Sequence, residues 1–224
     1  MALLLCIDTS TTHASVALAK DGVLIGMKAN QNQRDHASFL QPAVHSLLQE
    51  ANQTLKDLDA IAVTSGPGSY TGLRVGFASA KGLAYALDIP LISVETTLVM
   101  SAAASTILKN EEAALLCPMI DARRMEVFTA LYSADLKPVS SISALILNSD
   151  SFVRQLENSR IFFFGDGAPK WQIICTHSNA FFLDVKWTAG DMVGLADKLF
   201  EQKSFSSLAY SVPVYGKEFH STQI

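Results

Sequence analysis

Short apolar runs separated by turn residues open the chain and predict three consecutive strands. The runs cover residues 3–7, 15–19 and 23–27. The second and third runs flank Asp21-Gly22, a dipeptide that favours a tight type I′ turn. We therefore expect these two strands to form a β-hairpin.

A helical period follows over residues 36–51. Its apolar residues share one broad face, which consists of Phe39, Leu40, Ala43, Val44, Leu47, Leu48 and Ala51. Ser38 and Gln41 fit a capping box at the start of this helix. Pro42 lies just past the first turn, so a helix that began earlier would kink there.

Residues 58–64 form the next predicted strand, and the glycine-rich stretch SGPGSYTGLRVG, at 65–76, connects it to a second helix over about 71–87. The apolar residues of that helix recur at helical spacing: Leu73, Phe77, Ala80, Ala84 and Leu87. The helix ends before Pro90, because the residue before a proline avoids the helical conformation. The first half of the chain is thus predicted to follow the order βββαβα.

The second half repeats this order without repeating the sequence. Strands are predicted at residues 114–120, 125–132, 138–147, 160–165 and 180–185. Helices are predicted at 150–157 with Asp150 as the cap, near 169–175, and near 189–202 with the capping-box pattern Thr188-x-x-Asp191. Such a duplication predicts two α/β lobes with a cleft between them.

We place the division between the lobes in an apparently helical stretch near 96–109. The N-terminal lobe then covers residues 1–98 and carries the helices over 36–51 and 71–87, and a smaller C-terminal lobe covers 99–224. The last segment of the chain could pack back on the first lobe.

Composition and charge limit the classes of function that this chain could have. The chain of 224 residues is 49% hydrophobic and 17% charged, with a mean hydropathy of +0.25, which argues against disorder. Its net charge is −4, and no basic cluster is longer than Arg123-Arg124. Since nucleic-acid binding depends on neutralising phosphates with Lys and Arg, we do not expect this chain alone to bind RNA or DNA tightly.

The cysteines and the start of the chain predict a cytoplasmic location. The three cysteines, Cys6, Cys117 and Cys175, lie far apart without a C-x-x-C motif, so we expect free thiols in a reducing compartment. The opening MALLLCID is too short for a signal peptide, and no apolar run reaches 18 residues.

The glycine-rich stretch fits neither common phosphate-binding motif. A P-loop fails because five residues separate Gly66 from Gly72 and Leu73 follows, and the dinucleotide motif fails at Thr71, where it needs glycine. Two interpretations remain. The turn could bind an anion at Gly66 and Gly68 through amides at a helix N-terminus. The alternative, which we favour, is a ridge of small residues that allows another helix to pack closely, formed by Gly72, Gly76, Ala80 and Ala84.

Carboxylates lie at the ends of three predicted strands. In IDTST, at 7–11, Asp8 and its neighbouring hydroxyls could face a nucleotide phosphate or its metal, or could only cap local amides in an Asx turn. Asp121-Ala122-Arg123 and Gly165-Asp166-Gly167 also lie at strand ends, where α/β clefts collect ligands, although an ordinary turn is favoured for each.

Other chemistry is not evident. None of the five histidines pair at i, i+4 or lie near cysteines or carboxylates at ligand spacing, so we expect no metal site. No G-x-S-x-G motif occurs, because Gly68-Ser69 is followed by Tyr70-Thr71.

Five segments together resemble the TsaB (YeaZ) family: IDTST, DHASFLQPAVHSLL, SGPGSYTGLRVGFASAKGLAYAL, PLISVETT and IDARRMEVF. The resemblance is strong over about residues 3–130 and continues weakly through FGDGA and VPVY. It implies an actin-like, sugar-kinase-like (ASKHA) fold of two duplicated βββαβα lobes. It also implies a role in forming threonylcarbamoyladenosine next to the anticodon of tRNAs that read codons beginning with A.

The resemblance implies that the family is a non-catalytic relative of the transferase TsaD. The resemblance implies a heterodimer with TsaD that helps to recruit the ATPase TsaE, contact with tRNA only through the complex, and no membrane association. The two metal-binding histidine positions of the sister enzyme fall on Thr96 and Met100, which cannot replace two imidazoles. The resemblance thus implies a partner subunit that is not an enzyme and has no metal or cofactor of its own.

The family's dimer surface corresponds to the helices over 36–51 and 71–87, and the same surface could support a homodimer when the partner is missing. The predicted interface residues are Phe39, Leu40, Ala43, Val44, Leu47, Gly72, Leu73, Gly76, Phe77, Ala80 and Ala84. ATP or ADP could bind at the subunit junction. The candidate nucleotide-binding residues are Asp8, Ser10, Thr11, Gly66, Gly68, Asp121 and Arg123.

Two departures and two rivals complete the prediction. The family's terminal P-x-Y-L-R is Pro213-Val214-Tyr215-Gly216-Lys217 here, and the glycine pair near 165 is sparse for an adenosine site.

One rival is an autonomous actin-fold nucleotide hydrolase or phosphotransferase that uses Asp8 and Asp121. The other rival is a peptidase, but the chain shows neither a nucleophile paired with a general base nor a metal site for that chemistry.

Overall fold

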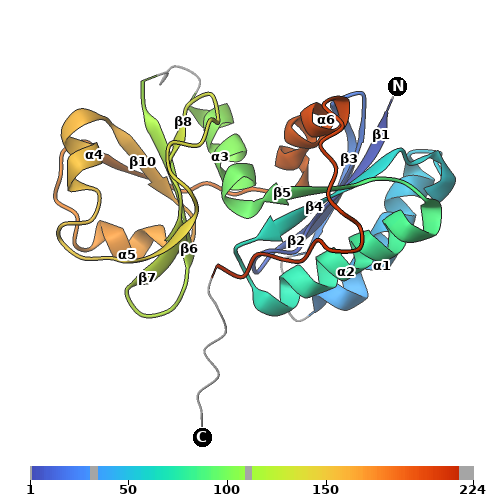
Figure 1. Ribbon diagram of the computed structural model, residues 1–224, viewed down its shortest axis with the longest axis horizontal. Coiled ribbons are helices and arrows are strands. Elements are labelled where there is room, and N and C mark those ends of the chain that lie inside the picture. The colour runs from blue at the N-terminus through green and yellow to red at the C-terminus, as the bar shows by residue number, and fades with distance from the viewer. Residues whose placement is uncertain (1, 31–34, 109–112, 217–224) are drawn as a thin grey trace, which may run out of the picture. The chain divides into compact units, whose positions relative to one another are not determined.

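The computed structural model describes residues 2–30, 35–108 and 113–216 and divides the chain into two compact units (Figure 1). The first unit consists of Met1–Val99 and Trp187–Pro213, and the second of Met100–Lys186 and Val214–Ile224. In the part of the chain that the structure describes, no helix is long and apolar enough to cross a membrane.

The first unit is built on a five-stranded sheet. Its strands are β1 (Leu3–Asp8), β2 (Ala14–Lys20), β3 (Val23–Asn30), β4 (Ala60–Gly66) and β5 (Leu91–Glu95), in the order β3-β2-β1-β4-β5. The β1–β2 and β2–β3 pairs are antiparallel, and the β1–β4 and β4–β5 pairs are parallel. Asp21 and Gly22 both have positive φ, which confirms the predicted hairpin turn between β2 and β3.

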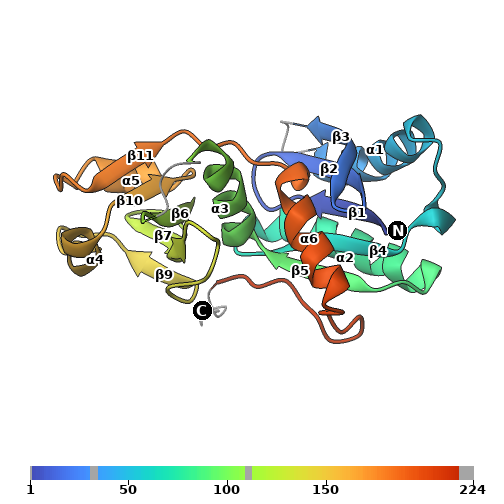
Figure 2. The ribbon, with the colours of Figure 1, turned by 90° about the horizontal axis from the view of Figure 1, so that it is seen from above.

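Helices cover both faces of this sheet (Figure 2). Because side chains alternate along a strand, Leu3, Leu5 and Ile7 of β1 pack with α1 (His36–Glu50) and α2 (Tyr70–Leu87). Leu4 and Cys6 point the other way, into a core closed by η3 (Ala189–Met192) and α6 (Val193–Glu201). Burial on both faces explains why β1 is apolar at nearly every position. A short 3₁₀ turn, η2 (Leu55–Asp57), precedes β4.

The second unit repeats the topology of the first. Its strands are β6 (Leu115–Asp121), β7 (Glu126–Thr129), β8 (Tyr132–Ser133), β9 (Ser143–Ile146), β10 (Ile161–Phe164) and β11 (Ala180–Leu183). Their order is β11-β10-β6-β7-β9, with β8 paired to β6 off this path. The β6–β10–β11 pairs are parallel and the β6–β7–β9 pairs antiparallel, as in the first sheet. This duplication confirms the predicted actin-like fold class.

The core of the second unit is aromatic. The rings of Phe152, Phe163 and Trp171 contact one another at centroid distances of 5.3–6.1 Å. Trp171 belongs to α5 (Ala168–Gln172), and Phe152 precedes α4 (Val153–Asn158). These contacts fix both short helices on the sheet.

The compact units divide the chain differently from the predicted lobes, although residues 187–213 do pack back on the first unit. A strand that was not predicted, β5, follows α2, and α3 (Thr96–Ile107) then leads from the first unit into the second. The helix predicted near 189–202 is present as η3 and α6, but it packs on the first sheet. The compact units therefore differ from a continuous division at 98/99, because residues 187–213 belong with 1–99.

Local details differ at two helix starts. The capping box at Thr188 and Asp191 is confirmed, since Thr188 N donates to Asp191 Oδ2 at 2.7 Å. The capping box at Ser38 is wrong, because α1 already begins at His36 and Ser38 Oγ donates back to the Asp35 carbonyl. Asp150 is not the cap of α4. That position is taken by Phe152 in the left-handed conformation.

Candidate functional site

The glycine-rich stretch forms the turn between β4 and α2 and packs on the loop that follows β1. Ser69 is the N-cap of α2, and its Oγ accepts a hydrogen bond from Gly72 N at 3.3 Å. Ser69 N donates to the Ser10 carbonyl at 2.6 Å. A Cβ on Gly68 would overlap that same carbonyl. Glycine is thus needed at 68 because two backbones meet there.

The small-residue ridge of α2 faces its own sheet. A Cβ on Gly72 would overlap the Thr9 carbonyl, and a Cβ on Gly76 would overlap Thr9 Oγ1. Thr9 Oγ1 donates to the Gly72 carbonyl at 2.7 Å. The ridge therefore allows close packing, as predicted, but against the end of β1 within the same unit.

The predicted interface residues are consequently core residues. Apart from the half-buried Phe39, all of them are buried within the first unit: Leu40, Ala43, Val44, Leu47, Gly72, Leu73, Gly76, Phe77, Ala80 and Ala84. Such side chains cannot meet a partner unless the unit opens. The prediction that they form an interface is wrong, because apolar spacing marks a buried face without saying what buries it.

The opposite faces of α1 and α2 are exposed and consist of small or polar residues. On α1 the exposed residues include Ala37, Gln41, Pro42 and His45. On α2 the exposed residues include Arg74, Ala78, Gly82, Tyr85 and Ala86. A Cβ on Gly82 would have no atom within 4 Å, and the Tyr85 side chain is 79% exposed. These residues define what we call the α1–α2 outer face.

Asp8 is buried at the end of β1 with its carboxylate bound internally. Its Oδ1 accepts hydrogen bonds from Ser10 N at 2.9 Å, Ser10 Oγ at 2.7 Å and Thr64 Oγ1 at 2.9 Å. Burial raises the pKa of Asp8, and these hydrogen bonds together with the nearby His36 oppose that rise. The local Asx-type turn considered for IDTST is therefore present.

Three of the five candidate nucleotide-binding residues of the first unit contact one another, since Ser10 N donates to Asp8 and Gly68 lies against the Ser10 carbonyl. Thr11 and Gly66 are their close neighbours in the sequence. Ser10 uses its amide and hydroxyl on Asp8 and its carbonyl on Ser69. The Gly68-Ser69 turn therefore packs directly on the backbone of Ser10.

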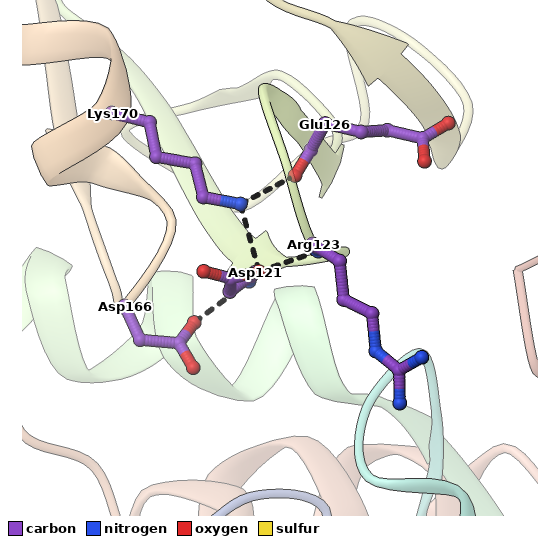
Figure 3. Close-up of polar contacts among 5 residues, drawn as sticks. All are labelled: Asp121, Arg123, Glu126, Asp166 and Lys170. Atoms are coloured by element: carbon purple, nitrogen blue, oxygen red, sulfur yellow. Dashed lines mark hydrogen bonds and ion pairs between the residues drawn. The ribbon is translucent and has the colours of Figure 1, made fainter.

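A second polar cluster lies at the ends of β6 and β10 (Figure 3). Asp121 Oδ1 accepts from Lys170 Nζ at 2.8 Å and from Arg123 N at 2.6 Å. Lys170 Nζ also donates to the Glu126 carbonyl at 3.0 Å, and Asp121 N donates to Asp166 Oδ1 at 2.9 Å. Lys170 therefore ties the β6–β7 hairpin to α5.

The pKa values of the two carboxylates in this cluster shift in opposite directions. Burial favours a higher pKa for Asp121, but the hydrogen bonds from Lys170 and Arg123 N outweigh it and hold that pKa below its usual range. Burial dominates at Asp166, and the negative charge of Asp121 adds to it, so the pKa of Asp166 is raised. The structure thus brings together Asp121 and Arg123, and adds Asp166 and Lys170 to them.

Lys170 was missed by the sequence analysis. Its partners, Asp121 and the Glu126 carbonyl, are distant in sequence, so no local spacing points to them. Arg123 and Arg124 both have positive φ at the hairpin tip and are exposed. In the second unit's cluster, Lys170 Nζ donates to the Asp121 carboxylate and the Glu126 carbonyl, and the Asp166 carboxylate accepts from the main-chain amide of Asp121.

The comparisons with known proteins agree with this fold. Residues 14–149, more than half of the chain, match the family model described as TsaD, tRNA N6-adenosine threonylcarbamoyltransferase. The tRNA threonylcarbamoyladenosine biosynthesis protein TsaB of Bacillus subtilis (strain 168) is 38% identical over 129 residues, which cover 58% of this chain and 54% of that protein. The protein of the same name from Escherichia coli (strain K12) is 29% identical over 220 residues, or 95% and 93% of the two chains.

A solved structure extends the match over the whole fold. A Pseudomonas aeruginosa protein, described as similar to peptidase YeaZ, superposes with a TM-score of 0.84 at 28% identity and covers 97% of this chain and 100% of its own.

The chain belongs to the TsaB (YeaZ) family. It spans about half the length of the Bacillus relative and nearly all of the Escherichia relative. The resemblance drawn from the sequence motifs is thereby confirmed.

Membership in the family directs attention to the start of α3, where Thr96 and Met100 lie. Both side chains are fully buried. Among the described residues, Thr96 Oγ1 has no hydrogen-bond partner, and no group of three or more His, Cys, Asp or Glu side chains could hold a metal ion. Met100 Cε lies beside Gly165, at the place that a Cβ on this glycine would take.

Proposed function

We propose that this chain is a non-catalytic subunit in tRNA threonylcarbamoyladenosine biosynthesis that docks on a TsaD-type transferase through the α1–α2 outer face. The relatives named TsaB and the match to the TsaD family model support the pathway. The exposed small-residue stripe of α2, with open space at Gly82, supports the choice of surface.

This surface replaces the one that apolar spacing suggested. Ala78, Gly82 and Ala86 recur every four residues and are exposed, so a partner helix could approach the α2 backbone closely. Tyr85 beside them offers a large, rigid side chain of the kind enriched at the centre of interfaces. A helix pair from each subunit would give a four-helix contact.

A non-catalytic role is supported by the chemistry at Thr96 and Met100. Both side chains are buried, and neither a hydroxyl nor a thioether is a good substitute for an imidazole on a metal that polarises a carbamoyl group. The transfer reaction is therefore assigned to the partner. In the same proposal, the complex recruits a TsaE-type ATPase and contacts tRNA, and any ATP or ADP binds at the junction of the subunits.

The docking surface is tested with two matched glycine variants. Gly82 in α2 and Gly194 in α6 are both exposed, and a Cβ at either would meet no atom within 4 Å. Both variants, Gly82→Glu and Gly194→Glu, should fold. Only Gly82→Glu should lose co-purification with the transferase, because a glutamate there holds the partner helix away and buries a charge. Undiminished complex formation by Gly82→Glu would contradict the proposal.

The proposal that this chain is non-catalytic is tested with the isolated chain. Titration calorimetry with ATP and magnesium should give no micromolar binding, since Ser10 and Asp8 are engaged within the chain. Micromolar binding accompanied by turnover would instead favour an autonomous nucleotide hydrolase or phosphotransferase.

A further inference from the structure

A cavity of about 460 Å³ opens in the second unit between α4, α5 and the loop that follows α5. Its buried lining residues include Leu156 and Trp171, and its exposed lining residues include Thr176 and Ser178. Cavities of roughly 300–1,000 Å³ are typical of small-molecule sites. We call this space the α4–α5 cavity. It shares no residue with the Asp121 cluster or with the α1–α2 outer face.

Trp171 brings a buried donor without a partner to this cavity. Its side chain is 1% exposed, and within residues 2–30, 35–108 and 113–216 its Nε1 makes no hydrogen bond. Contacts with the rings of Phe152 and Phe163, at centroid distances of 5.7 and 6.1 Å, hold the indole in place. An indole N–H can only donate, and a buried donor without an acceptor is unfavourable. The group that completes this bond is therefore an acceptor that enters the cavity.

The other polar groups of the lining are either used within the chain or open to a ligand. Ser151 Oγ accepts a hydrogen bond from Asn148 N at 3.0 Å, so it already serves the loop before α4. His177 Nδ1 accepts from Asn179 N at 3.1 Å, which places the proton of the neutral ring on Nε2. That Nε2 is a second donor of the lining, and the hydroxyls of Thr176 and Ser178 can both donate and accept.

The absence of charge restricts what the cavity can hold. In the part of the chain that the structure describes, its lining contains no Asp, Glu, Lys or Arg. A carboxylate, phosphate or ammonium ion would lose its hydration there without meeting an opposite charge. Val153, Leu156 and Ile174 add apolar surface to the lining. The cavity thus favours an uncharged molecule with an apolar body and a hydrogen-bond acceptor.

We propose that the α4–α5 cavity binds an uncharged small molecule that carries an amide group. The amide oxygen accepts from Trp171 Nε1, and an apolar group of the same molecule packs on Leu156 and Ile174. An amide is favoured over an ester or a ketone, because only the amide also offers an N–H to the hydroxyls of Thr176 and Ser178. The site lies in the second unit, so it does not depend on the function of the α1–α2 outer face.

The indole N–H signals in ¹H–¹⁵N spectra of the full chain test this site. The probe is N-acetyl-L-leucinamide, which is uncharged and combines amide groups with an isobutyl group. The chain has two tryptophans, and Trp187 does not line the cavity. The probe should shift the Trp171 signal downfield to saturation and leave the Trp187 signal in place. N-acetyl-L-leucine, which has a carboxylate in place of one amide, should bind about tenfold more weakly or worse.

Alkylation of Cys175 gives a second readout. Cys175 lines the cavity and is partly exposed, whereas Cys6 and Cys117 are fully buried. Treatment with iodoacetamide followed by mass spectrometry should therefore find Cys175 labelled first. N-acetyl-L-leucinamide should slow that labelling, because it occupies the space beside the thiol.

Two matched tryptophan variants separate the donor from the rest of the cavity. Trp171→Phe keeps an aromatic ring but removes the N–H, so the dissociation constant of the probe, measured by protection of Cys175, should rise about fivefold or more. Trp187→Phe makes the same change at an Nε1 that is also buried without a partner among the described residues, and it should leave protection unchanged. Its missing signal also assigns the spectrum, and thermal unfolding verifies the fold of both variants.

Three results would each overturn the proposal. The first is a Trp171 signal that the probe does not shift to saturation, which would mean that a bound water alone serves this donor. The second is equal binding of N-acetyl-L-leucine, and the third is full protection of Cys175 in a folded Trp171→Phe chain. If Trp171→Phe does not fold, the spectra of the unmodified chain with the two probes still decide.

Discussion

At the scale of single residues, the glycines of α2 act through what surrounds them. Gly72 and Gly76 lie against Thr9, where a single extra carbon would overlap the loop after β1. Gly82, two turns further on, is open to solvent. The same residue type therefore permits close packing at one end of the helix and is only a weak helix former at the other.

Substituting these glycines should have opposite effects on stability. Gly76→Ala should lower the free energy of unfolding by about 1–3 kcal/mol, because the new Cβ displaces Thr9 and weakens its hydrogen bond to the Gly72 carbonyl. Gly82→Ala should raise it by about 0.5–1 kcal/mol through helix propensity alone. Urea unfolding measures both, and equal effects of the two variants would refute the packing argument.

Asp8 is expected to make stability depend on pH. Its pKa in the folded protein is raised above the unfolded value, so the folded state binds the proton more tightly, and stability is lost as pH rises through that raised pKa. Asp8→Asn keeps an oxygen for the three donors but cannot ionise. The unmodified chain should therefore lose stability relative to Asp8→Asn as pH rises from acid to neutral.

Asp8→Ala is the control for the hydrogen bonds themselves. Compared with Asp8→Asn, it leaves Ser10 N, Ser10 Oγ and Thr64 Oγ1 without their acceptor and should cost about 1–3 kcal/mol at every pH. Urea titrations at several pH values separate the two effects. A constant difference between the unmodified chain and Asp8→Asn would show that Asp8 does not titrate in the range measured.

At the scale of elements, α2 has two working faces. Its inner face packs Leu73, Phe77 and Ala80 into the core, and its outer face carries Ala78 and Gly82. The strap formed by residues 203–213 lies along the same helix, where Lys81 Nζ donates to the carbonyls of residues 209 and 211 at 3.4 and 3.0 Å. Positions two residues apart on α2, such as Ala78 and Ala80, therefore differ completely in burial.

Glutamate at neighbouring alanines of α2 should separate these roles. Ala80→Glu places a charge where the side chain is fully buried, and it should lower the free energy of unfolding by about 3–5 kcal/mol. Ala78→Glu, on the outer face, should fold normally and weaken binding to the transferase. Circular dichroism melting and co-purification, carried out on both variants, distinguish a lost fold from a lost surface.

At the scale of the whole molecule, the first unit is made from both ends of the chain. Ala189, Met192, Val193 and Ala196 cover the face of the first sheet that holds Leu4 and Cys6. Ser206 N donates to the Leu91 carbonyl at 2.8 Å, and Ser206 Oγ accepts from Ser93 N at 3.1 Å. Residues 187–213 are therefore a structural part of the first unit, although they are distant from it in sequence.

Shortened chains test this arrangement. Residues 1–99 alone should fail to unfold cooperatively, because one face of their sheet is bare. The same residues joined through a flexible Gly/Ser linker to 187–213 should regain a cooperative transition in urea. Cooperative unfolding of residues 1–99 alone would contradict the role given to α6.

Sequence patterns predicted the elements better than their partners. Apolar periodicity located most strands and helices, because the spacing of apolar residues within a segment reflects which of its faces is buried. β5 is as long as the runs predicted at 3–7 and 15–19, but it was missed because it lies between two stretches that were assigned as helical, 71–87 and 96–109. The pattern of residues 189–202 shows an apolar face but not which sheet covers it. For the same reason, the ridge at Gly72 and Gly76 was assigned to a partner instead of the chain's own β1.

The discontinuity of the first unit also sets an order for biosynthesis. A ribosome releases residues 1–99 long before 187–213, and during that interval the nascent sheet has no α6 to cover its second face. The middle segment, residues 100–186, emerges with its own core complete and can fold first. The first unit can be completed only after the last residues are translated, so this protein is expected to fold from the middle of the chain outwards.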